Sequence, residues 1–188
     1  MIPDFSQAGL LIIDVQEKLL AAMPTTVAAE CLKNVELLAD LVGEMGGPIF
    51  YTEQYPRGLG ATVPSLRARL GDAQRIEKIS FSCLGESDFL ERVVPELPDY
   101  LIVVGMEAHV CVLLTIFDLV AEYEREDQAP AVFVPLDAVC SRKKGHWQNG
   151  LDQMAEFGAI ITNTESLAYQ AIGEAGTERF KRYAPRLR

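Results

Sequence analysis

Three polar side chains of this sequence follow runs of aliphatic residues, and their chemical types suit hydrolysis by a thiol nucleophile. They are Asp14, Lys78 and Cys111. A carboxylate can take the proton of a thiol and later deliver it to a leaving group, while a nearby ammonium favours the thiolate. If the fold brings the three together, they form a nucleophile, its base and an electrostatic partner.

Each of these residues also has an ordinary structural interpretation. An aspartate at a strand end commonly caps the next helix, a lone lysine is usually solvated, and most cysteines are small core residues. Cys31, on an apolar helical stripe, fits that last description. Cys111 differs because it opens a helix, whose first turn has unpaired N–H groups and a positive dipole end. We therefore expect a lowered pKa for the Cys111 thiol, and further lowering if Lys78 is near.

Short aliphatic runs recur along the chain and are apolar on both faces, as the strands of a covered parallel sheet are. Five of them cover residues 9–14, 47–53, 100–105, 131–138 and 158–163, and residues 75–80 form a weaker sixth. Stretches with helical three- and four-residue spacing lie between them. This alternation predicts a three-layer α/β/α sandwich, and no linker or internal repeat divides residues 1–188, so we expect a single domain. Ligands of such sheets bind beyond the carboxyl ends of the strands, where the three polar residues are expected.

The composition argues against several classes of partner. The chain has 188 residues, 49% of them hydrophobic, and a formal net charge of −10. Nucleic acids and anionic membranes both call for basic patches, so neither is an expected partner. No apolar run is long enough to span a bilayer, and the N-terminus lacks the basic segment of a signal peptide. Four scattered cysteines without a C-x-x-C pair indicate reduced thiols and a cytoplasmic location.

Three segments of the chain form an ordered set: LLIIDVQEKL, EKISFSCL and VVGMEAHVCVLLTIFDL. In this order and at these separations they resemble the signature segments of the isochorismatase-like cysteine hydrolases. The tail over residues 137–173 also resembles that superfamily, especially the branch of isochorismatase domain-containing proteins. The likeness covers nearly the whole chain.

The resemblance implies a Rossmann-like, isochorismatase-like sheet of six mostly parallel strands flanked by helices. It implies that Asp14 is the general base and acid, Lys78 the electrostatic partner and Cys111 the nucleophile. It further implies a cis peptide bond between Met106 and Glu107, with the backbone N–H groups of Glu107 and Cys111 directed at a developing oxyanion.

The same resemblance suggests which residues border the substrate pocket and whether a metal is needed. The expected pocket residues are Gln16, Gln54, Tyr55 and Phe81. Leu19 and Leu84 stand where many relatives have aromatic residues, which makes the pocket less suited to a flat ring. True isochorismatases lack the nucleophilic cysteine. The region after the second strand reads YTEQYPRGLG, without the histidine of the nicotinamidase metal cluster, so we expect no metal and no other cofactor.

These features favour a metal-independent hydrolase acting on a C–N bond of a small amide, carbamoyl or ureido compound through a Cys111 thioester. Two rivals remain: a pseudoenzyme or small-molecule-binding scaffold of the same fold, and a thiol redox protein with Cys83 as a second thiol. His109 is poorly placed for a Cys–His dyad, because residues two apart on a helix point to different sides. His146 is expected on a surface loop before the next helix. Residues 110–123 are apolar nearly all round, so we expect a helix buried against the sheet or a partner subunit, and a homo-oligomer.

Overall fold

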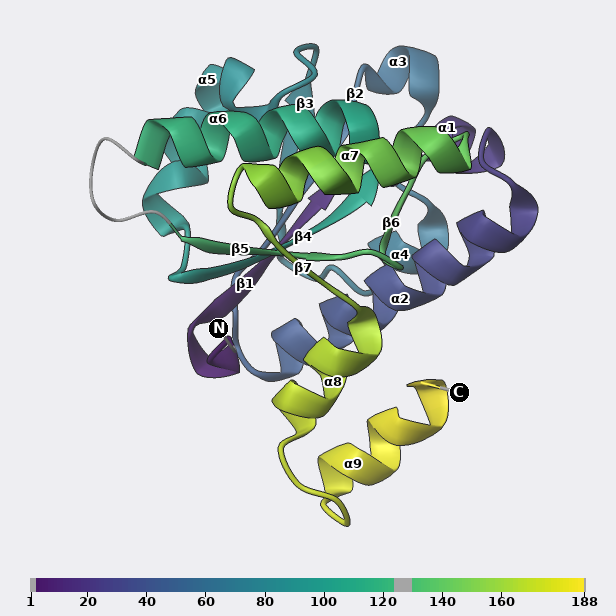
Figure 1. Cartoon of the computed structure of the whole chain (residues 1–188), viewed down its shortest axis with the longest axis vertical. Helices are drawn as coiled ribbons and strands as arrows, with labels where there is room; N and C mark the ends of the chain where they lie inside the picture. The colour runs from purple at the N-terminus through teal and green to yellow at the C-terminus, as the bar shows by residue number, and fades with distance from the viewer. Residues whose placement is uncertain (1–2, 124–129, 188) are drawn as a thin grey trace.

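A computed structural model describes residues 3–123 and 130–187, and in it a parallel sheet lies between two layers of helices (Figure 1). The strands of the described part are β1 (Ala8–Ile13), β2 (Ile49–Gln54), β3 (Gln74–Lys78), β4 (Tyr100–Met106), β5 (Ala131–Pro135), β6 (Val139–Cys140) and β7 (Ile160–Thr162). Six of them follow the order β3-β2-β1-β4-β5-β7, and β6 pairs with β4. Every pair is parallel. The predicted three-layer sandwich is confirmed.

The seventh strand, β6, arises where one long strand was expected over residues 131–138. β5 ends at Pro135, which has no N–H to continue the ladder. A turn at Leu136 and Asp137 follows, and the chain then pairs with β4 instead, with Val139 opposite Gly105. The split places the residues after β6 beside the segment that follows β4.

The helices that cover the sheet are, within the described residues, α1 (Glu17–Ala21), α2 (Thr25–Glu44), α3 (Pro56–Leu59), α4 (Pro64–Arg67), α5 (Ser87–Arg92), α6 (Leu113–Tyr123), α7 (Lys144–Glu156), α8 (Thr164–Ile172) and α9 (Glu178–Tyr183). Short 3-10 turns occur at η1 (Phe5–Gln7), η2 (Cys83–Gly85), η3 (Val94–Glu96) and η5 (Ala184–Leu187), and a π-helical turn, η4 (Ala108–Val112), leads into α6. None of the described helices is long and apolar enough to cross a membrane.

The two faces of the sheet are covered by different helices, as the alternation of side chains along a strand requires. Leu10 and Ile12 of β1 belong to the core cluster shared with α2 and α8. Leu11 and Ile13 belong to the cluster shared with α6 and α7, which lie on the opposite side of the sheet in Figure 1. Strands buried on both faces explain why the aliphatic runs were readable in the sequence.

The order of the strands reverses between β1 and β4. From β1 the chain builds outward through β2 to β3, then crosses to the other side of β1 to form β4. In open α/β sheets the carboxyl ends at such a switch point are where ligands bind. Asp14 follows β1 and Cys111 follows β4, so both lie at this point.

A glycine allows β1 and β4 to approach closely just before Asp14. Gly105 pairs with Ile13 and has a φ of +123°, a conformation that L side chains rarely adopt. A Cβ atom added there would lie 2.0 Å from the carbonyl oxygen of Ile13, which is rigid backbone.

We therefore expect Gly105→Ala to lower the free energy of unfolding by about 3 kcal/mol or more, because both strain and overlap oppose the side chain. Gly145→Ala on α7 is the matched control, since a Cβ there meets nothing within 4 Å. It should be neutral or stabilising by up to about 1 kcal/mol. Urea unfolding followed by circular dichroism measures both. Equal stability of Gly105→Ala and wild type would contradict this account of the β1–β4 contact.

Candidate active site

Asp14 is the first residue after β1, and its backbone turns into the left-handed region there, with a φ of 54°. The side chain is fully buried. Its Oδ1 accepts a hydrogen bond from the Thr52 hydroxyl at 2.7 Å, and its Oδ2 lies 2.7 Å from the Lys78 ammonium. Despite that short distance, Oδ2 has no donor of ordinary hydrogen-bond geometry among the described residues. The contact with Lys78 is thus an ion pair that leaves Oδ2 able to accept a proton.

Lys78 ends the edge strand β3 and reaches past the end of β2 to Asp14. Its ammonium donates hydrogen bonds to Oε1 of Gln54 at 2.7 Å and to the carbonyl oxygen of Phe81 at 3.1 Å. Burial lowers the pKa of Lys78, but the neighbouring charge of Asp14 leads the effects that outweigh it, and the pKa lies above its usual value. The side chain is therefore a fixed positive charge at neutral pH.

Cys111 lies in the π-helical turn η4 and is 7% exposed. Asp14 and Lys78 are the two charged groups that act on its thiol. Burial raises the pKa of Cys111 to about 12, Asp14 raises it further, and Lys78 opposes them. The expected lowering of this pKa is wrong, because loss of hydration and the adjacent carboxylate outweigh both the lysine and the start of the helix.

The arrangement is that of a neutral thiol held beside a carboxylate and an ammonium of opposite charge. Thiolate is scarce in such a site before the reaction. Chemically, a carboxylate beside a thiol can accept its proton when the sulfur attacks an electrophile, which is general-base catalysis. The ammonium is placed to stabilise the negative charge that the attack creates.

The four expected pocket residues divide into two kinds. Gln16 and Gln54 are buried and bind the backbone. The side-chain amide of Gln16 donates to the carbonyl oxygens of Gln54 at 3.0 Å and Gly60 at 2.6 Å. Its Oε1 accepts from the Gln54 N–H at 2.8 Å. Tyr55 and Phe81 are 52% and 58% exposed. The glutamines therefore brace the carboxyl end of β2, and only the two aromatic residues are open to a substrate.

Residues after β6 contact the π-helical turn η4, which contains Cys111, and the residue before it, Glu107. Nδ1 of His109 lies 3.0 Å from the Ser141 hydroxyl, and Arg142 forms an ion pair with the buried carboxylate of Glu107. Nε2 of His109 lies 3.4 Å from that carboxylate. His109 is thus engaged by partners other than Cys111. The peptide bond between Met106 and Glu107 is cis, as the resemblance implied.

Ser141, Arg142 and Thr52 were missed by the sequence analysis. Thr52 gave one signal, since it is a polar residue inside an otherwise buried strand. Ser141 and Arg142 lie in a polar stretch with no periodicity, and nothing in the sequence distinguishes them. His146 was expected on a loop, but it lies in the first turn of α7, where its ring packs 4.5 Å from that of His109 between centroids.

The other thiols and the acidic groups bear on redox and metal chemistry. Cys83 is fully buried, and burial raises the pKa of its thiol to about 12, with Lys78 lowering it and Asp14 raising it. Cys83 and Cys111 are therefore both influenced by Lys78 and Asp14. Across residues 3–123 and 130–187, no three His, Cys, Asp or Glu side chains are grouped so as to hold a metal ion.

Residues 8–166 match the model of the isochorismatase domain. The chain belongs to the isochorismatase-like hydrolase family. Isochorismatase domain-containing protein 2 of Xenopus laevis is 32% identical over 179 residues, which cover 92% of this chain and 79% of that protein.

Solved structures of the family share the fold. The MAR1 ribonuclease of Caenorhabditis elegans has a TM-score of 0.85 and 30% identity, over 100% of this chain and 92% of that one. The YcaC gene product of Escherichia coli, described as an octameric hydrolase of unknown specificity, has a TM-score of 0.83 and 23% identity, over 100% of this chain and 87% of that one.

Replacing either charged neighbour is expected to change how fast Cys111 is alkylated. Asp14→Asn removes the charge that raises the thiol pKa and leaves Lys78 to pair with the thiolate, so labelling should be faster by roughly tenfold or more. Lys78→Met should slow it by a similar factor. The measurement is iodoacetamide labelling at pH 8, followed for each peptide by mass spectrometry.

In the wild type, Cys111 should label first, because it is 7% exposed and the other three cysteines are 1% exposed or less. Asp88→Asn, an exposed carboxylate on α5, is the matched control and should label at the wild-type rate. Slower labelling in Asp14→Asn, or preferential labelling of Cys83 or Cys140, would contradict the assignment.

Proposed function

We propose that this chain is a metal-independent cysteine hydrolase that cleaves a C–N bond of a small amide, carbamoyl or ureido compound. The observation that supports the proposal is the buried ion pair of Asp14 and Lys78 at the switch point of the sheet, since both groups act on the Cys111 thiol. A carboxylate, an ammonium and a thiol at one point supply a base, a fixed charge and a nucleophile.

In the first half of the reaction, the sulfur of Cys111 attacks the substrate carbonyl carbon while its proton passes to Asp14. The carbonyl oxygen becomes an oxyanion, for which the backbone N–H groups of Glu107 and Cys111 are the proposed donors. One such donor contributes on the order of 3–4 kcal/mol to the transition state. Asp14 then gives its proton to the leaving nitrogen, the C–N bond breaks, and an acyl thioester remains on Cys111.

In the second half, Asp14 takes a proton from water as the water oxygen attacks the thioester carbonyl. The C–S bond breaks, and the sulfur recovers a proton from Asp14, which regenerates the neutral thiol. Asp14 thus alternates between base and acid in each half of the reaction. Lys78 keeps one positive charge throughout.

Exposed apolar residues that follow β2 and β3 favour substrates with an apolar part. Tyr55, Ile79 and Phe81 are 52%, 68% and 58% exposed and follow β2 and β3 directly. Exposed apolar side chains gathered beside a catalytic group commonly contact ligand. A small amide with an apolar acyl group is the substrate that suits both these exposed residues and the buried thiol.

A relative carries the name ribonuclease, but the charge of this chain does not support that activity here. An RNA substrate calls for a basic surface, and the formal net charge is −10. The scaffold alternative is disfavoured because a ligand-binding role alone gives no reason to bury an ion pair beside a thiol.

Small amides, carbamates and ureido compounds should release ammonia or amine in the presence of the protein. Cys111→Ala should lower the rate by at least about 10³-fold, because it removes the nucleophile. Cys83→Ala is the matched thiol variant and should keep most of the activity. A coupled assay for ammonia, with carboxylate product identified by mass spectrometry, measures both.

Nicotinamide should be a poor substrate in the same panel, and EDTA should not change the rate on any substrate. Chelator-sensitive turnover of nicotinamide would overturn the metal-independent mechanism. Equal loss of activity in Cys83→Ala and Cys111→Ala, together with a requirement for reductant, would favour the redox alternative.

We also propose that copies of the chain assemble through the outer face of α6 and α7. Ile116 and Leu119 of α6 are buried on the sheet, as expected, but Leu114 is 37% exposed. Phe157, at the end of α7, is 47% exposed and stacks on Phe117 with centroids 3.8 Å apart. Exposed aliphatic and aromatic side chains on neighbouring helices are typical of a subunit interface.

Light scattering at micromolar concentration should give a mass that is a multiple of 20.7 kDa. Leu114→Lys should shift that mass to the monomer, since a buried unpaired ammonium is costly at an interface. Leu90→Lys on α5 replaces a residue that is 44% exposed elsewhere and should leave the mass unchanged. A monomeric wild type would refute the assembly.

A further inference from the structure

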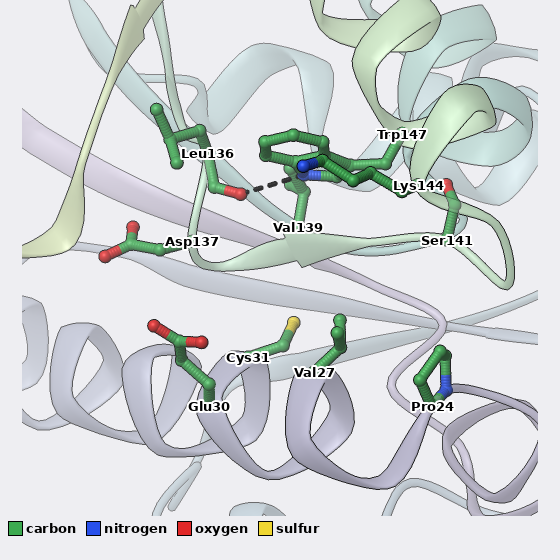
Figure 2. A pocket seen from close by; sticks show the side chains of 10 residues that line it. All are labelled: Pro24, Val27, Glu30, Cys31, Leu136, Asp137, Val139, Ser141, Lys144 and Trp147. Carbon is green, nitrogen blue, oxygen red and sulfur yellow. Dashed lines mark hydrogen bonds between the residues drawn. The ribbon is translucent and has the colours of Figure 1, made fainter.

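A cavity of about 320 Å³ is lined by residues other than the three of the proposed mechanism. Figure 2 shows its lining side chains. One wall is α2, and the other is the turn between β5 and β6 with the start of α7. Its volume is at the lower end of the range for small-molecule sites, about 300–1,000 Å³. Its lining includes neither the thiol of Cys111 nor its two charged neighbours.

The walls are mainly apolar. Val27 comes from α2, Leu136 from the turn after β5, and Trp147 from α7. The indole N–H of Trp147 donates to the carbonyl oxygen of Leu136 at 3.0 Å, which fixes the ring at the edge of the cavity (Figure 2). Cys31, which is 1% exposed, points its sulfur from α2 toward β6 at the floor. A ligand here would bury apolar surface against an aromatic ring and aliphatic side chains.

One end of the cavity is acidic. Glu30 on α2 and Asp137 on the facing turn direct their carboxylates to the same end, as Figure 2 shows. Oδ1 of Asp137 accepts hydrogen bonds from the N–H and the hydroxyl of Thr164, at 2.8 and 2.9 Å, so this carboxylate is held in place. Within the described residues Glu30 forms no ion pair. Lys144, the one cation of the lining, lies on the Trp147 side in Figure 2.

The negative field of this acidic end reaches the cavity floor. Contact with Cys140 and burial raise the pKa of the Cys31 thiol most, and the charges of Asp137 and Glu30 raise it further. A positive charge placed in the cavity would therefore be attracted, even though the carboxylates are partly hydrated.

We propose that this cavity is a second small-molecule site, which takes a small organic amine with an apolar or aromatic body. The ammonium would lie between Glu30 and Asp137, and the body would rest on Val27, Leu136 and Trp147. Charge complementarity selects the amine over an acid of the same shape, and the apolar walls select it over an inorganic cation.

The cavity also lies next to the π-helical turn η4, which carries Cys111. Ser141 lines the cavity, and its hydroxyl contacts His109 in the turn that carries Cys111. An occupant would thus lie one side chain away from the turn that carries Cys111, without contacting Cys111 itself. The site does not depend on the proposed hydrolase activity, so its test uses binding alone.

The sequence offers a built-in reporter, because Trp147 is the sole tryptophan of the chain. The experiment titrates the full-length protein with three probes that share a phenyl body: phenethylamine, 2-phenylethanol and 3-phenylpropionate. Tryptophan emission is followed. Phenethylamine should give a saturable change, with a Kd about threefold to tenfold lower than that of the alcohol, since ion pairs at exposed sites contribute up to about 1 kcal/mol each. The acid should bind more weakly than the alcohol.

Glu30→Gln should weaken binding of phenethylamine by roughly threefold or more and leave the alcohol unchanged. Glu36→Gln, also on α2 but paired with Arg69 and outside the cavity, is the matched control and should bind like the wild type. Absence of a saturable change, equal affinity for amine and alcohol, or tighter binding of the acid would each overturn the proposal. Emission that depends on protein concentration and not on amine would show that a second copy covers the cavity, which also overturns it.

Discussion

The buried ion pair between Asp14 and Lys78 is the interaction on which the rest of the site depends. Moving either charge into the interior alone would cost several kcal/mol, so each must be compensated in place. Thr52 donates to the carboxylate, while Gln54 and the Phe81 carbonyl accept from the ammonium. These groups come from β2 and from the segment after β3. The register of three strands is therefore tied to the position of one ion pair.

Burial of Cys111, more than the ion pair, determines the state of the thiol. A carboxylate and an ammonium side by side have nearly opposite effects on Cys111, so burial decides, and the thiol stays neutral. During the proposed attack, Asp14 becomes neutral as it takes the proton, and the negative charge moves to the substrate oxygen. The Lys78 ammonium then lies near the substrate oxyanion in place of the Asp14 carboxylate. The total charge of the buried site is constant, which avoids the cost of creating charge in a medium of low polarity.

Much of this site was predictable because it follows a local rule. Strands buried on both faces leave unbroken aliphatic runs, and functional residues follow the carboxyl ends of such strands, which is how Asp14 and Cys111 were found. The fold class and the family were predicted for the same reason. Lys78 was harder, since its strand is short and half-exposed, and the resemblance supplied its role.

What could not be predicted depends on contacts between distant segments. Gln16 lies in a segment that suggested a pocket, but it bonds to backbone across the loop after β2. Ser141 acts on His109 only because β6 leaves β5 and pairs with β4. The pKa of Cys111 was misjudged because a helix terminus is visible in a sequence, whereas the depth of burial is a property of the assembled core.

The place of Lys78 on an edge strand has a consequence for how the proposed activity would be lost. β3 pairs on one side only, with β2, whereas β1 and β4 are flanked on both sides. Edge elements open at lower free energy than the centre of a sheet, so β3 can detach while the core stays folded. Such an opening withdraws the ammonium and leaves a buried carboxylate beside the thiol, a charge state that holds the sulfur protonated. The proposed hydrolase would then lose activity through a local opening that leaves its secondary structure almost intact. The time for which it stays active would depend on how readily β3 opens, and not on global unfolding of the domain.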